Sequence, residues 1–87
     1  MKKAPEKKMQ QVVDKTQQAL AQKLYELRVD REFTQTELSE LAGVDRKTIN
    51  RIENGHFSPS LDTLTRLSVV LKCRLADFLK SSTSSRR

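Results

Sequence analysis

The sequence predicts a small all-α fold of five core helices with an additional helical extension at the N-terminus. Three observations predict it. Apolar residues recur at helical spacing along most of the chain, residues suited to helix caps stand before these segments, and Gly43 and Gly55 follow two short ones. The 87 residues suit one domain. We expect residues 1–15 to form a basic, partly helical extension, residues 16–80 to form the domain, and residues 81–87 to form a disordered tail.

The first helical segment extends from about residue 6 to residue 31. Apolar residues continue at nearly one helical phase through it, from Met9 and Val13 to Leu20 and beyond. Either one long helix or two helices would satisfy this pattern. A break near residues 14–16 is favoured, because Asp14 or Thr16 could cap a second helix.

The next helix has a well-marked start. Thr34 and Glu37 have the spacing of a capping box, so the helix should begin at Gln35. Phe33 and Leu38 occupy the two positions of a hydrophobic staple, which would fix the angle at which the chain enters this helix. The apolar face is expected to comprise Leu38, Leu41 and Ala42.

A second short helix follows the turn at Gly43. Asp45 can cap it, and Ile49 and Ile52 form its buried stripe. The remaining side chains should point outward: Arg46, Lys47, Thr48, Asn50 and Arg51. Two short helices joined by a tight glycine turn, with a basic and amide-bearing face on the second, fit a helix-turn-helix that places one helix in the DNA major groove.

The C-terminal third should add two helices. Residues 56–59 read as a loop, with Phe57 folding back onto the core, and Pro59 marks the end of that loop. Ser60 can cap a fourth helix whose expected buried residues are Leu61, Leu64, Leu67, Ser68 and Leu71. A short final helix over about residues 75–80 would pack Leu75, Phe78 and Leu79.

Several of these spaced positions together resemble the Cro/C1-type helix-turn-helix family of phage repressors, restriction-modification controller proteins and antitoxins. The matching residues are Thr34-Gln35, Glu37-Leu38, Leu41-Ala42-Gly43, Ile49, Ile52-Glu53-Asn54-Gly55, Ser58-Pro59-Ser60-Leu61, Leu64, Leu67 and Leu71. The resemblance covers about residues 20–79, with residues 34–55 as the helix-turn-helix proper. It implies a lambda-repressor-like domain that binds double-stranded DNA. Glu32 departs from the pattern, because the family often has glycine there.

The resemblance also implies roles for individual residues. Base reading would fall to Arg46, Lys47, Thr48, Asn50 and Arg51, since arginine can bind guanine with two hydrogen bonds. Phosphate contacts would come from Thr34, Gln35, Asn54 and His56, which set the register on DNA without reading its sequence. Arg28 and Glu53 match positions that form a buried, purely structural ion pair in some members.

A homodimer is expected, because one short reading helix limits affinity and related proteins bind two-fold operators as dimers. The family's first helix begins near Thr16, so apolar residues before it exceed what the core needs. The candidate interface residues are Met9, Val12, Val13, Val69 and Val70. The sequence does not exclude a protein partner such as a toxin or polymerase.

Composition excludes other classes. The net charge is +6, but residues 1–8 carry +3 and residues 81–87 carry +2, so the domain itself must rely on a few well-placed cations. One cysteine and one histidine provide neither a metal cluster nor a catalytic set, and no cofactor or enzymatic activity is expected. The absence of a long apolar run argues against a membrane span and favours a cytoplasmic location.

The leading prediction is thus a sequence-specific transcriptional regulator, a homodimeric repressor that places the helix from about Asp45 to Asn54 in the major groove of a palindromic operator. An antitoxin or a restriction-modification controller that regulates its own operon is the alternative within the same chemistry. A protein-interaction module on the same fold is the alternative from another class, and Arg46, Lys47 and Arg51 argue against it.

Overall fold

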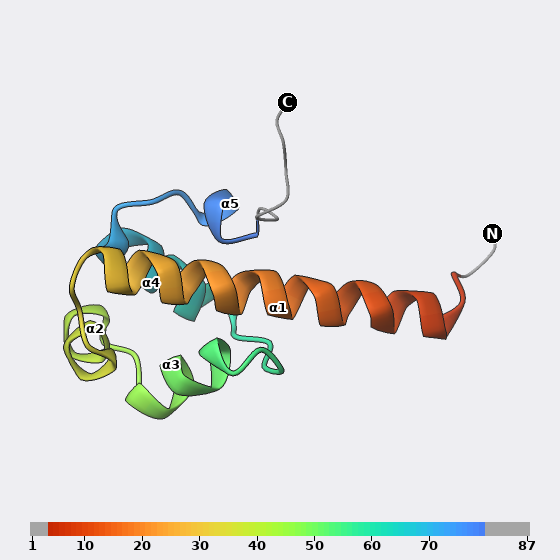
Figure 1. Ribbon diagram of the computed structural model, residues 1–87, viewed down its shortest axis with the longest axis horizontal. Helices are drawn as coiled ribbons and strands as arrows, with labels where there is room; N and C mark the ends of the chain where they lie inside the picture. Colours follow the sequence, from red (N-terminus) through yellow and green to blue (C-terminus); the bar gives the residue numbers. More distant parts are fainter. Residues whose placement is uncertain (1–3, 80–87) are drawn as a thin grey trace.

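The computed structural model describes residues 4–79, and five α-helices account for its regular structure (Figure 1). They are α1 (Glu6–Asp30), α2 (Gln35–Ala42), α3 (Arg46–Glu53), α4 (Leu61–Leu71) and α5 (Leu75–Phe78). The all-α prediction is confirmed. None of these helices has the length and hydropathy needed to cross a membrane. The tail predicted over residues 81–87 lies outside the described residues, and so does Lys80, the last residue of the predicted final helix.

α1 is one helix of 25 residues, so the break expected near residues 14–16 is wrong. The two side chains that could have capped a second helix instead bond within the helix. The Gln10 amide donates to the Asp14 carboxylate at 2.9 Å, and the Thr16 hydroxyl donates to the Val12 carbonyl at 2.8 Å. Both are contacts over four residues, which an uninterrupted helix brings together. In Figure 1 the N-terminal half of α1 projects well beyond the other helices.

The core lies between the C-terminal half of α1 and the other four helices. Its largest fully buried side chains are Leu24, Leu38, Ile49, Ile52, Leu67, Leu71 and Phe78. Burying one such side chain contributes about 1.5–3 kcal/mol. Phe33, Phe57 and Leu75 pack against this core, as predicted.

Three leucines that were expected to pack in the core are exposed instead. Leu41 is 60% exposed, Leu61 is 66% exposed, and Leu79, which follows the end of α5, is 50% exposed. In the eight-residue α2, Leu38 and Ala42 already fill the side that faces the core, and Leu41 instead borders a shallow hollow next to Val69 of α4. Leu61 is the first residue of α4, one turn before the first buried residue of that helix, Leu64.

The helix ends follow the predicted local chemistry. The Thr34 hydroxyl accepts from the Glu37 amide at 3.0 Å, and the Glu37 carboxylate accepts from the Thr34 amide at 2.9 Å, so the capping box forms. Gly43 ends α2 in the left-handed conformation at φ 68°. Asp45 occupies the N-cap of α3, although its side chain makes no capping hydrogen bond there.

The turn between α1 and α2 places Glu32 at φ 59°. A side chain in this left-handed region costs about 1 kcal/mol relative to glycine. Glu32 stands where the family often has glycine, and the backbone at this position is strained for a residue with a side chain.

Candidate DNA-binding surface

The two faces of α3 have opposite environments. Ile49 and Ile52 are completely buried, and the side chains of Arg46, Lys47 and Arg51 are exposed. Thr48 is half-buried at the edge of the exposed face. In Figure 1, α3 lies along the lower side of the molecule, with α1 above it and α2 beside it. The outer face of this helix is thus free to approach a ligand.

Three cations on that face have no acidic partner among residues 4–79. The ion pairs within residues 4–79 join Arg28 to Glu53, Arg31 to Asp30 and Arg66 to Asp62. Arg46, Lys47 and Arg51 take part in none of them. Unpaired and exposed cations on one helix face are suited to bind phosphates or the acceptor atoms of guanine.

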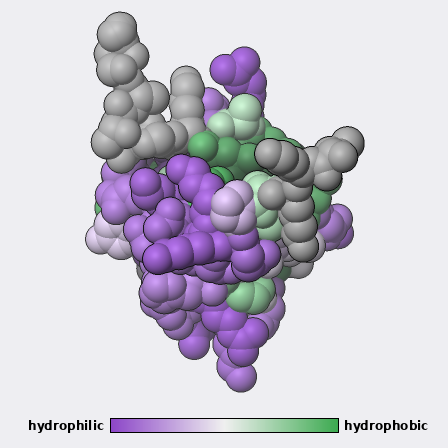
Figure 2. All heavy atoms as spheres, turned by 90° about the vertical axis from the view of Figure 1, so that its right-hand side faces the viewer, coloured by the Kyte–Doolittle hydropathy of each residue, from purple (hydrophilic) through white to green (hydrophobic). Residues whose placement is uncertain are grey.

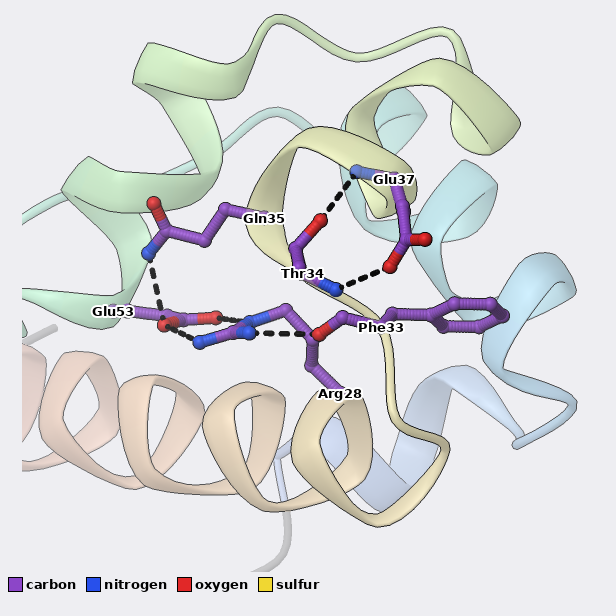
Figure 3. A network of polar contacts seen from close by, with 6 residues as sticks. All are labelled: Arg28, Phe33, Thr34, Gln35, Glu37 and Glu53. Carbon is purple, nitrogen blue, oxygen red and sulfur yellow. Dashed lines mark hydrogen bonds and ion pairs between the residues drawn. The ribbon is translucent and has the colours of Figure 1, made fainter.

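A buried ion pair holds α3 against α1 (Figure 3). The Arg28 guanidinium donates to both Glu53 carboxylate oxygens, at 2.7 and 3.0 Å, and to the Phe33 carbonyl at 2.8 Å. The two side chains are only 12% and 8% exposed. The Glu53 carboxylate raises the pKa of Arg28, an effect that desolvation partly opposes. The pair implied by the family resemblance therefore forms, and it links α3 to the end of α1.

Gln35 belongs to the same network. Its side-chain amide donates to Glu53 at 3.1 Å, so it ties the first turn of α2 to the last turn of α3 (Figure 3). Sequence reasoning assigned Gln35 to phosphate and missed this bond. A glutamine in the first turn of a helix gives no sign, in the sequence, of a contact with a residue 18 positions away.

A groove of about 400 Å³ lies between α1 and α3. Amide side chains dominate its polar lining, with Gln35, Asn50 and Asn54 on one side and Gln18 and Gln22 of α1 on the other. The α1 residues were not predicted as site residues. Their spacing of four could have indicated a shared helix face, but nothing in the sequence shows that this face adjoins α3.

The remaining predicted residues surround the reading face. Asn50 points to the groove beside α1, to the side of the three cations. Asn54 ends α3, and His56 lies exposed in the loop that follows. The Thr34 hydroxyl is committed to the capping box. The structure thus gathers the predicted base readers on one helix. The predicted phosphate residues lie near its C-terminal end, where Gln35 bonds to Glu53 and where Asn54 and His56 follow the helix.

Comparison with known proteins identifies the class. The model of the helix-turn-helix family matches residues 24–78, and the chain therefore belongs to this family. Its fold and its family make it a DNA-binding regulator of the Cro/C1 type with a lambda-repressor-like domain. None of the curated proteins compared with the sequence matches it.

Three solved structures illustrate the similarity. The restriction-modification controller protein C.AhdI from Aeromonas hydrophila is 27% identical, with a TM-score of 0.68 over 71% of this chain and 94% of its own. The N-terminal DNA-binding domain of SinR from Bacillus subtilis is 25% identical, with a TM-score of 0.72 over 77% and 99%. The clp gene regulator ClgR from Corynebacterium glutamicum is 28% identical, with a TM-score of 0.68 over 74% and 68%.

Proposed function

We propose that this protein is a sequence-specific transcriptional repressor that binds a palindromic operator as a homodimer. One observation carries the proposal: the exposed face of α3 presents three cations that pair with no described acidic residue, on a helix fixed by buried contacts. A rigid helix with a basic outer face is what major-groove reading requires. The similarity to the SinR DNA-binding domain supports it.

In this proposal some residues contact base edges and others contact phosphates. Arg46 and Arg51 read guanine through O6 and N7, and each good pair contributes about 1–3 kcal/mol of discrimination. Lys47 and Thr48 contact the bases beside them, and Asn50 contributes least because it lies toward α1. Phosphates beside the base-reading residues are bound by Thr34, Gln35, Asn54 and His56. These contacts fix the register of the protein on DNA.

Selection of bound duplexes from a random DNA pool tests this function. We expect the wild type to enrich a palindromic motif containing guanines, and Arg46→Ala and Arg51→Ala to relax the preference at those guanines. Arg66→Ala is the matched control, because Arg66 is an exposed arginine on α4 whose partner is Asp62. No enriched motif, with binding that depends on salt alone, would refute the proposal and favour a protein-interaction module.

A second function is a restriction-modification controller or an antitoxin that regulates its own operon. The observation that favours it is the match to C.AhdI, which covers 94% of that controller protein. Binding of the purified protein to its own promoter, measured by footprinting against an unrelated promoter, tests this alternative. Equal protection of the two promoters would reject it.

A further inference from the structure

The N-terminal half of α1 carries an apolar surface that none of residues 4–79 covers. The first buried residue of this helix is Leu20, and no residue from Glu6 to Ala19 is buried. Met9, Val12 and Val13 are 36%, 53% and 42% exposed. A helical segment this short is marginally stable in water without packing on one of its faces. A partner surface would supply that packing.

The exposed residues form a regular stripe along α1. Met9, Val13, Thr16 and Leu20 follow one another at intervals of four, three and four residues, which is the spacing of a helix-packing seam. Thr16 is the polar member, and its hydroxyl is already bonded to the Val12 carbonyl at 2.8 Å. Covering this stripe would therefore bury no unsatisfied hydroxyl.

The stripe leads into an apolar hollow of about 180 Å³ beside the base of the projecting segment. Residues from four parts of the chain form its walls: Thr16 and Leu20 of α1, Phe57 and Pro59 of the loop before α4, Leu64 of α4, and Leu79 after α5. Leu79 is half exposed at its rim, and a hydrogen bond of 2.7 Å from Gln17 to Ser58 joins α1 to the loop after α3. Figure 2 views this end of the molecule and shows apolar surface gathered on one side, above a hydrophilic face.

We propose that this surface, the stripe and hollow together, binds a second copy of the chain, with the two α1 segments crossing antiparallel. The hollow lies seven to eleven residues from Met9, or about 10–16 Å along the helix. A two-fold axis between Val13 and Thr16 then places Met9 of each copy at the hollow of the other, an arrangement that satisfies both surfaces at once.

The area that a specific interface needs favours a second copy as the occupant, and the charge of the segment does not oppose it. A specific interface needs about 800 Å² from each partner, and one short stripe is too small unless the adjoining hollow is used as well. Two-fold pairing uses the stripe and the hollow of each chain. Residues 6–16 contain three lysines and two acidic residues, a net charge of +1, so two such segments can lie together with little repulsion.

The other apolar candidate, on α4, is less suitable. Val69 is 72% exposed, but Val70 is half-buried, and the hollow beside them is bordered by the ion-paired Arg66 and Asp62. An interface there would have to bury this charged pair, which costs free energy of desolvation. Val69 therefore provides a control for the α1 surface.

Sedimentation equilibrium of the full chain tests the inference. We expect the wild type to dimerise at concentrations of about 10–100 micromolar, Val13→Glu to weaken the dimer at least about tenfold, and Val69→Glu to leave it unchanged. Both valines are exposed, so both variants should keep the wild-type circular dichroism, and Met9→Glu provides a second substitution in the stripe. A monomeric wild type at about 100 micromolar, or dissociation by Val69→Glu in place of Val13→Glu, would overturn the inference.

The inference rests on the proposed function, because a two-fold operator requires two copies, but the two can fail separately. An enriched DNA motif together with a monomeric wild type would keep the reading role of α3 and reject the α1 interface. A dimer that Val13→Glu dissociates, together with no enriched motif, would keep the interface and reject the proposed function.

Discussion

The inner and outer faces of α3 differ in what they contact and in what substitutions on them should change. The inner face carries Ile49 and Ile52 in the core, with Glu53 beside them in a buried ion pair. The outer face carries Arg46, Lys47 and Arg51, which contact no acidic residue among those described. The comparison teaches that one eight-residue helix can separate the residues that stabilise the fold from those proposed to read DNA, because its core side is packed and its solvent side is exposed.

The largest effect should come from the inner side. Arg28→Ala leaves the 8% exposed Glu53 carboxylate without its cation, and we expect it to lower the free energy of unfolding by about 3 kcal/mol. Urea unfolding followed by circular dichroism measures the loss. The double variant Arg28→Met with Glu53→Leu removes both charges and should recover much of it. A loss below about 0.5 kcal/mol in Arg28→Ala would show that the pair does not stabilise the fold.

The outer face should give the converse result. We expect Arg46→Ala and Arg51→Ala each to weaken binding to the selected operator by about 1–3 kcal/mol. The free energy of unfolding should change by less than about 0.5 kcal/mol, because both side chains are exposed. Fluorescence anisotropy and urea unfolding of the same samples measure the two quantities. Equal losses in the free energies of unfolding and of DNA binding would show that the outer face stabilises the fold as much as it contributes to binding.

A residue at the end of α3 should affect binding without affecting specificity. Asn54→Ala removes a proposed phosphate contact, and we expect it to weaken binding by about 1 kcal/mol on operator and scrambled DNA alike. Anisotropy titrations with the two duplexes give the ratio of affinities. A change in that ratio would instead make Asn54 a base reader.

The smallest effect should arise away from both faces, in the turn that leads into α2. Glu32→Gly removes the side-chain strain caused by the positive φ at this position, because glycine adopts this φ without a steric penalty. It should raise the free energy of unfolding by up to about 1 kcal/mol. DNA affinity should stay the same. Glu40→Gly serves as the contrast, because Glu40 lies within α2, where glycine destabilises a helix. A loss of stability in Glu32→Gly would show that its side chain makes an undetected favourable contact.

Local chemistry made the sequence predictive of much of this fold. The capping box at Thr34, the turn at Gly43 and the buried isoleucines of α3 all depend on neighbours within a few residues, and all were predicted. The Arg28–Glu53 pair came through the family resemblance, because its partners lie 25 positions apart.

The errors and omissions involve contacts between elements. Asp14 and Thr16 suit a helix cap and a helix interior equally well, so the sequence could not exclude a continuous α1. Leu41 has the right period for the core, but the packing of α2 on α4 leaves it exposed. The groove beside Gln18 depends on how α1 crosses α3, and the bond from Gln35 to Glu53 depends on how α2 packs against α3. Periodicity specifies neither.

The central claim is that Arg51 on the outer face of α3 reads a guanine. The most direct test is a double-mutant cycle that combines Arg51→Ala with 7-deazaguanine, which lacks the N7 acceptor, at each guanine of the selected operator. We predict that at one guanine the replacement weakens binding of the wild type but not of Arg51→Ala, with a coupling of about 1 kcal/mol or more. Equal losses for both proteins at every guanine would contradict the account.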